Sequence, residues 1–185
     1  TKAYKTYRVT FPTTAGNSTC CMQVAEVELL GTAIKDDVTQ PTDVIVASSA
    51  NSPGSEGVAN VIDNKPTKYL NFDGKNNQPS GFTVTPSAGK SIVTGLTIQS
   101  ANDAPDRDPA TYELSGSNDG TTFTPISSGD VPEFGTDRFK TVEIAFANAV
   151  GGDHTIVEVQ AGWRDRQDLL GYYNAFHRHF YASNF

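Results

Sequence analysis

The sequence of 185 residues is poor in the residue types that most often carry catalysis or metal chemistry. It contains three histidines, two cysteines, one tryptophan and one methionine. Basic residues are also few, because 14 Lys and Arg stand against 21 Asp and Glu, for a formal net charge of −7. This acidic balance argues against a sequence-independent nucleic-acid binder, which needs a basic face, and disfavours docking on anionic lipid. No nucleic-acid partner is therefore expected.

Long apolar runs are absent. No stretch approaches the roughly 20 residues that a transmembrane helix requires, and no signal peptide stands at the start. Because the chain begins with Thr1 rather than methionine, we expect a mature product or a fragment. A chain of this length can bury one good core, or form one domain with an appendage.

The only two cysteines are neighbours, Cys20 and Cys21. A disulfide between neighbours is strained, because its usual Cα separation exceeds the spacing of successive residues. The C-x-x-C spacing of metal and redox sites is missing. We therefore expect one cysteine to be buried as a small apolar side chain and the other to be exposed.

Catalytic motifs are missing as well. The sequence has no G-x-S-x-G nucleophile elbow and no Gly-rich phosphate loop. His177 and His179 stand two residues apart, which on a helix directs them about 200° apart, whereas zinc-binding helices use i and i+4. We predict that the chain is not an enzyme and that these histidines hold no metal.

The sequence does contain many short segments of alternating polarity, separated by turn-forming residues. In residues 4–11, Tyr7, Val9 and Phe11 fall on one side of a strand, and Ser117-Asn118-Asp119-Gly120 is typical of a hairpin with a primed turn. Further strands are expected at 22–30, 44–47 (short and buried), 69–72, 81–85, 91–99, 111–116 and 139–146. Short strands at this spacing indicate an all-β sandwich.

A turn within residues 56–72, EGVANVIDNKPTKYLNF, has the composition of a cation site. Asp63 and Asn64 begin a tight loop, Pro66 fixes a backbone angle, and Thr67 places a hydroxyl four residues after the carboxylate. Such a turn, with its backbone carbonyls, supplies the hard oxygen ligands that Ca²⁺ prefers. The alternative is an Asx-type turn without metal.

Four segments together resemble the discoidin, or coagulation-factor type C, domains of the galactose-binding-like jelly-roll group. They are MQVAEVELLG at 22–31, the stretch 56–72, GFTVTP at 81–86 and SANDAPDRDPATYELSGSNDG at 100–120. The resemblance implies an antiparallel jelly-roll β-sandwich. It also implies a non-catalytic carbohydrate-binding or adhesion module of an extracellular or cell-surface protein.

The resemblance further implies a structural calcium ion. In that family an Asp-led loop and a Glu on the last strand commonly hold it, and these roles fall on Asp63, Thr67 and Glu26. Carbonyls near Asn60 and Lys65 are expected to fill the shell. Glu158, in the similar IVEVQ, competes with Glu26, and we choose Glu26 because Glu158 follows a change in composition.

The order of the segments differs from that of the family. Strands resembling 4–11 and 22–30 close the domain in relatives, whereas here they open the chain. The chain is either cut from a tandem array or permuted, so that residues 1–33 supply strands of a preceding or permuted repeat. Since two isolated strands cannot bury their faces alone, we expect residues 4–31 to pack with 44–148 in one domain of residues 1–150.

Residues 151–185 form a divergent tail. Leu169, Tyr173, Phe176 and Phe180 step by four, three and four, the spacing of one helical face. We predict that residues 164–180 form an amphipathic helix or remain disordered.

Candidate ligand-binding residues crowd two loops. Sugar recognition needs amides, carboxylates and arginine for hydroxyl groups, and an exposed aromatic ring for the apolar sugar face. The candidates are Tyr69, Asn71, Asn102, Asp103, Asp106 and Arg107. In the alternative reading, Arg107 pairs with a neighbouring Asp to brace its loop, and Tyr69 belongs to the core.

The expected partner is a glycan or cell-surface polysaccharide, because the Asp-rich loops lack the apolar tips that lipid binding requires. The alternative function is an accessory fragment of a larger secreted enzyme, such as a glycoside hydrolase, with catalysis outside this chain.

Overall fold

The computed structural model describes residues 2–31, 36–146, 172–174 and 179–181. The chain divides into two compact units, Thr1–Gly151 and Gly152–Phe185. Within the described residues, no helix has both the length and the apolar character that crossing a membrane requires.

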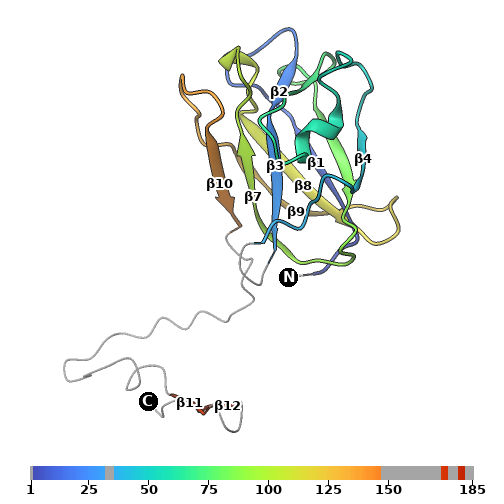
Figure 1. The fold of residues 1–185 in the computed structure, drawn as a ribbon, viewed down its shortest axis with the longest axis vertical. Coiled ribbons are helices and arrows are strands. Elements are labelled where there is room, and N and C mark those ends of the chain that lie inside the picture. The colour runs from blue at the N-terminus through green and yellow to red at the C-terminus, as the bar shows by residue number, and fades with distance from the viewer. Residues whose placement is uncertain (1, 32–35, 147–171, 175–178, 182–185) are drawn as a thin grey trace, which may run out of the picture. The chain divides into compact units, whose positions relative to one another are not determined.

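The first unit is a sandwich of antiparallel sheets (Figure 1). One sheet has the order β4-β6-β1-β8-β9, a second has the order β10-β7-β3, and β2 pairs with β5 beside them. The strands are β1 (Thr6–Phe11), β2 (Met22–Val24), β3 (Glu26–Gly31), β4 (Val44–Ala47), β5 (Tyr69–Asn71), β6 (Ser80–Thr85), β7 (Val93–Gln99), β8 (Thr111–Ser117), β9 (Thr124–Asp130) and β10 (Thr141–Ala145). Two 3₁₀ turns, η1 (Val58–Ile62) and η2 (Pro105–Arg107), lie in the connections. The prediction of an all-β sandwich is confirmed.

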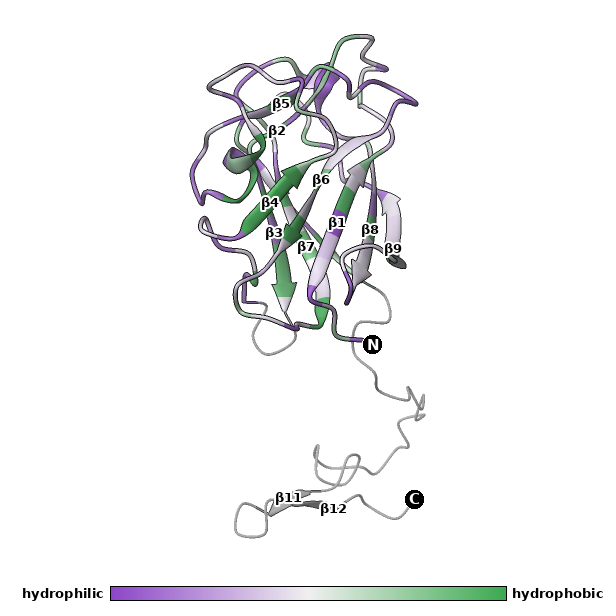
Figure 2. Ribbon diagram, turned by 90° about the vertical axis from the view of Figure 1, so that its right-hand side faces the viewer, coloured by the Kyte–Doolittle hydropathy of each residue, from purple (hydrophilic) through white to green (hydrophobic). Residues whose placement is uncertain are grey.

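The core lies between the five-stranded and three-stranded sheets. Tyr7, Val9 and Phe11 are at most 1% exposed, as their alternation along β1 predicts. Leu96 and Ile98 of β7, in the other sheet, are fully buried. Many residues of the connections at one end of the sandwich are hydrophilic, whereas hydrophobic residues are prominent along β3, β4 and β6 (Figure 2).

The N-terminal strands are integral to the sandwich. β1 lies between β6 and β8, and β3 pairs with β7. Ala25 separates β2 from β3, and at this point the chain leaves β5 and joins β7. Residues 6–31 therefore bury their apolar faces against strands that follow them in the sequence.

Two details of the strands differ from the predictions. β4 is not buried: Val44 and Val46 are 69% and 61% exposed, because β4 is the edge strand and its alternate side chains face outward. The β8–β9 hairpin forms, but residues 118–123 connect its strands, in place of a two-residue primed turn. Gly120 has positive φ (75°), and the Asp119 carboxylate accepts hydrogen bonds from the backbone N–H groups of Thr121 and Thr122.

The second unit contains an antiparallel pair, β11 (Tyr172–Asn174) and β12 (His179–Tyr181). The prediction that residues 164–180 form one helix or remain disordered is therefore wrong for these residues. Aromatic residues favour strands, and Gly171 weakens a helix. His177 lies outside the described residues, as does the rest of the predicted helix.

Cys20 and Cys21 form a disulfide, contrary to the expectation of two unlinked side chains. Cys21 is fully buried and Cys20 is exposed, as predicted. The Ser18 hydroxyl oxygen accepts hydrogen bonds from both cysteine N–H groups, at 3.3 and 3.4 Å. This Ser-based turn holds the two residues in place.

Candidate functional site

Four connections converge at the end of the sandwich far from the N-terminus (Figure 1). We call this region, formed by residues 12–21, 72–79, 100–110 and 131–140, the loop end. Backbone hydrogen bonds join its loops: Ala15 N–H donates to the Asp108 carbonyl (2.8 Å), and Asn76 N–H donates to the Ser18 carbonyl (3.1 Å). Gly16 lies so close to η2 that a Cβ there would stand 2.3 Å from the Asp106 Cβ. The loops are thus fastened to one another as well as to the strands.

The centre of the loop end is an ion pair between Arg138 and Asp108. The guanidinium donates to both carboxylate oxygens, at 2.6 and 3.1 Å, and also to the Asp103 carbonyl at 3.0 Å. Asp108 is 1% exposed, and this desolvation raises the pKa of its carboxyl, while the hydrogen bonds from Arg138 act in the opposite direction. Arg138 therefore joins loop 131–140 to loop 100–110.

A second cation, Lys68, supports the same loop. Its ammonium lies 3.2 Å from the Asp103 carboxylate and 3.3 Å from that of Glu56. The predicted ligand residue Asp103 is thus paired, although it remains exposed, and its neighbour Asn102 is exposed beside it.

Phe139 is the most unusual residue of the loop end. It has φ of 57°, where bulky side chains are strained, and its side chain is 42% exposed. Reciprocal bonds between Ser100 and Lys140 (2.9 and 3.0 Å) fix the backbone on one side of it, and the Arg138 pair fixes the other. An aromatic ring is thereby held at the surface alongside the segment that contains Asn102.

Neither Arg138 nor Phe139 is identifiable as a site residue from the sequence. They lie in GTDRFK, which has no periodicity and no motif spacing. Their roles depend on a partner about thirty residues earlier in the chain, so no local signal identifies them.

Two of the predicted ligand residues are in the core. Tyr69 and Asn71 are both 0% exposed, so their side chains do not reach the surface. The Asn71 amide donates to the Tyr69 hydroxyl (3.0 Å) and to the Ser49 carbonyl (2.8 Å). These side chains are buried because β5 is covered on both faces, and they support the loops rather than line a ligand surface.

Arg107 does not brace its loop as the alternative reading supposed. In the described residues it forms no ion pair, and its buried Nε has no hydrogen-bond partner. Asp106 is exposed next to it on η2. The bracing role belongs to Arg138.

The predicted calcium turn brings together Asp63, Thr67 and Glu26. The Thr67 hydroxyl donates to one Asp63 carboxylate oxygen (2.5 Å), and Lys65 N–H donates to the other (2.9 Å). Glu26, on β3, accepts from the Asn64 N–H at 3.1 Å. The N-terminal strand therefore places its carboxylate at a turn that begins 37 residues later in the sequence.

The environment of Glu26 fits a bound cation. Its side chain is 8% exposed, and Oε1 is buried without a hydrogen-bond partner. Desolvation and, next, the nearby charge of Asp63 raise the pKa of Glu26 to about 8. A divalent cation between the two carboxylates would offset the desolvation of Glu26 and its repulsion by Asp63. It would also give the unpartnered Oε1 of Glu26 a ligand bond.

Asn60, near which a carbonyl ligand is predicted, uses its side chain within the loop. The Asn60 amide donates to the Ser55 and Lys68 carbonyls, at 2.9 and 2.7 Å, which closes the loop around the turn. No group of three or more His, Cys, Asp or Glu side chains suited to a metal occurs in the described part of the chain. A cation here would thus depend on two carboxylates supplemented by hydroxyl and carbonyl oxygens.

Residues 44–169 match the model of the F5/8 type C domain. No curated protein and no solved structure matches the chain. Domains of this type are generally carbohydrate- or lipid-binding modules, typically non-catalytic, and occur mainly in extracellular or secreted proteins. The match begins at β4 and covers most of the chain, and the described strands form the corresponding sandwich. The chain belongs to the F5/8 type C, or discoidin, domain family.

Proposed function

We propose that the protein is a non-catalytic carbohydrate-binding module of an extracellular or cell-surface protein, and that its loop end binds the glycan. The observation that carries this proposal is Phe139, an exposed aromatic ring at positive φ, in a backbone segment that Arg138 and Lys140 fasten to residues 100–103. Strained residues that the surrounding structure holds in place cluster at binding sites.

The chemistry of this surface suits a sugar ring. The face of Phe139 can cover the apolar face of a pyranose, while the amide of Asn102 and the carboxylate of Asp106 can bond its hydroxyl groups. The Arg138–Asp108 and Lys68–Asp103 pairs hold the loops in place before the ligand binds. Little conformational entropy of the loops is therefore lost on binding. Arg107 offers guanidinium donors at the same end.

Carbohydrate is favoured over lipid because of the charge of the loops. Asp73, Asp103, Asp106 and Asp137 are exposed at the loop end, and they would repel an anionic headgroup surface. The large apolar side chains exposed in these loops are Phe72 and Phe139, both about two-fifths exposed. That is a small apolar area for insertion into a bilayer.

A glycan array tests the proposal with the wild type and three variants. Phe139→Ala and Asn102→Ala should each lower binding about tenfold or more, because each removes one ligand contact. Val44→Thr changes an exposed apolar side chain on β4 and should bind like the wild type. Equal binding by all four proteins would reject the loop-end site, and hydrolysis of a bound glycan would reject the non-catalytic role.

We further propose that a structural calcium ion binds at the turn of Asp63 and Thr67, with Glu26 as the carboxylate from β3. Backbone carbonyls near Asn60 and Lys65 would complete the oxygen shell. The buried free oxygen of Glu26 and its proximity to Asp63 support this proposal. The ion would hold η1 and its turn against β3 rather than take part in chemistry.

Thermal melting with calcium and with chelator tests this proposal. Binding to the native state alone stabilises by about 2.7 kcal/mol at a hundredfold excess over Kd, so the midpoint should rise with calcium. Asp63→Ala should abolish the rise, while Asp106→Ala, an exposed carboxylate elsewhere, should keep it. Equal melting midpoints in all conditions would reject the calcium site and support the alternative of an Asx-type turn without metal.

A further inference from the structure

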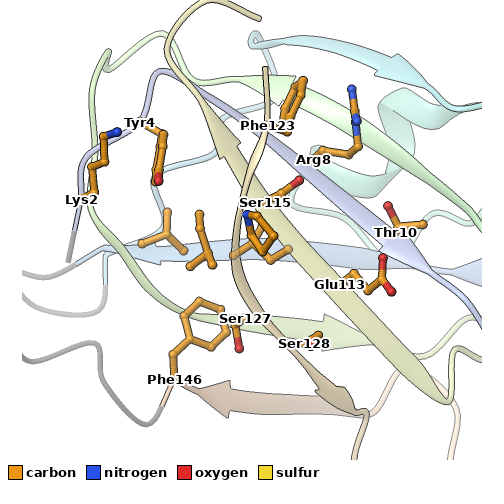
Figure 3. A pocket seen from close by; sticks show the side chains of 14 residues that line it. Lys2, Tyr4, Arg8, Thr10, Glu113, Ser115, Phe123, Ser127, Ser128 and Phe146 are labelled. Atoms are coloured by element: carbon orange, nitrogen blue, oxygen red, sulfur yellow. The ribbon is translucent and has the colours of Figure 1, made fainter. Parts of the chain in front are cut away.

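A groove of about 980 Å³ opens around β8 and β9, on residues distinct from those of the loop end. Its lining combines outer-face side chains of the five-stranded sheet with apolar residues of the core side, among them Val93, Leu114 and Phe146. Its polar lining includes Arg8, Thr10, Glu113, Ser115 and Ser128 (Figure 3). We call this feature the outer groove. Its size is at the upper end of the range typical of small-molecule sites.

Strand register places these side chains on one face of the five-stranded sheet. Arg8 lies opposite Ser115, and Thr10 lies opposite Glu113, across the β1–β8 pair. Directly opposed residues of antiparallel strands share a face. Because Tyr7 and Val9 alternate with Arg8 and point into the core, this shared face is the outer one.

Phe123, from the β8–β9 connection, holds the Arg8 guanidinium in place. The guanidinium carbon lies 3.7 Å from the centre of the Phe123 ring, and Nε lies 3.5 Å from the Thr83 hydroxyl. Stacking on a ring fixes the plane of the guanidinium and leaves its edge free to donate hydrogen bonds. Figure 3 shows Arg8 and Phe123 side by side at one border of the groove.

Arg8 stacks on Phe123, but neither charged group of the sheet face, Arg8 or Glu113, is paired with an opposite charge in the described residues. Both side chains are exposed. The hydroxyls of Thr10, Ser115 and Ser128 lie on the same face. The Arg8 guanidinium, which can donate several hydrogen bonds, and the Glu113 carboxylate, which can accept them, therefore face the same groove without pairing with each other.

We propose that the outer groove is a second carbohydrate site, which binds a neutral oligosaccharide. Adjacent hydroxyls of a sugar can accept from Arg8 and donate to Glu113 at once, which an anion or a cation alone cannot do. The charges of Arg8 and Glu113 offset each other, and Lys2, the other charged residue of the lining, lies over the Tyr4 ring at 5.4 Å, so the ligand needs no net charge where Arg8 and Glu113 bind it. This site is separate from the proposed loop-end site, and a long chain that reaches both would gain avidity.

The test uses the neutral and the uronate-bearing glycans of an array, with full-length protein. Arg8→Ala and Glu113→Gln should each weaken binding of neutral glycans about tenfold. Arg8→Lys, which keeps the charge but loses the planar fork, should bind nearly as weakly as Arg8→Ala. Lys5→Ala removes a neighbouring exposed cation that does not line the groove, and it should bind like the wild type. Melting midpoints confirm that each variant is folded.

The outcomes separate this site from the loop end. Wild-type binding by both Arg8→Ala and Glu113→Gln, with loss in Phe139→Ala, would overturn the outer groove and leave the loop-end site standing. Loss in the groove variants alone would support the groove and reject the loop end. A wild-type protein that retains only uronate-bearing glycans would overturn the neutral ligand proposed here, while carbohydrate binding itself would stand.

Discussion

Arg138 illustrates how a single residue organises the proposed binding surface. Its guanidinium holds two groups of loop 100–110, the almost wholly buried carboxylate of Asp108 and the carbonyl of Asp103. Removing one partner of a buried pair leaves an uncompensated charge. We therefore expect Arg138→Ala to lower the free energy of unfolding by about 3 kcal/mol, measured by urea denaturation.

The matched variants for this prediction are Arg138→Lys and the double variant Arg138→Ala with Asp108→Ala. The lysine keeps the charge and should recover part of the loss. The double variant removes the stranded carboxylate and should be less destabilised than the sum of the two single changes. A loss below about 0.5 kcal/mol for Arg138→Ala would mean that the pair behaves as a solvated surface contact.

Glu26 gives a prediction for pH. In chelator, its folded-state pKa of about 8 lies above its ordinary value of 4.5, chiefly because of desolvation. Between these values the folded protein binds more protons than the unfolded chain, so stability should fall as pH rises from about 5 to 8. The slope contributed by one group is at most about 1.4 kcal/mol per pH unit.

Urea denaturation in chelator at pH 5, 6.5 and 8 measures this slope. Glu26→Gln cannot ionise, so it should flatten the slope in this window. The same slope in wild type and variant would assign the pH dependence to other groups.

At the scale of elements, the N-terminal strands carry the most direct prediction. β1 is an interior strand of the five-stranded sheet, and β3 covers one side of β7. A chain that begins at residue 36 would expose these edges and the core faces of both sheets. We expect that fragment to be unfolded by circular dichroism, and to fold when a peptide of residues 2–31 is added. A cooperative melt of the fragment alone would contradict the role assigned to β1 and β3.

The strands were the most predictable elements, because alternation is a local signal. Tyr7, Val9 and Phe11 predicted the inner face of β1, and the Asp119-Gly120 pair predicted the β8–β9 hairpin. The exposure of β4 was not predictable in this way, because Val44 and Val46 face solvent only as a result of their place at a sheet edge. In the tail, helical spacing of aromatic residues competed with their preference for strands, and a strand pair forms at 172–174 and 179–181.

Across the whole molecule, some candidate site residues could be predicted from local sequence and others only from the fold. The turn of Asp63 and Thr67 was readable from spacing, and resemblance to a family identified Glu26, which the fold brings to that turn. Arg138, Phe139 and the Arg8–Phe123 stack join segments far apart in the sequence, so only the fold reveals them. For Tyr69 the sequence suggested a site that the fold does not form: an aromatic ring can stack on a sugar, but this ring is buried in the core.

The measurement that most directly tests the central claim is an NMR titration of isotopically labelled protein with a glycan retained on the array. We predict that the backbone amides of residues 100–106 and 136–140 shift together with Phe139, and that the shifts saturate. In Phe139→Ala the same amides should require at least about tenfold more glycan. Shifts restricted to the opposite end of the sandwich, at residues 86–91 and 118–123, would contradict glycan binding by the loop end.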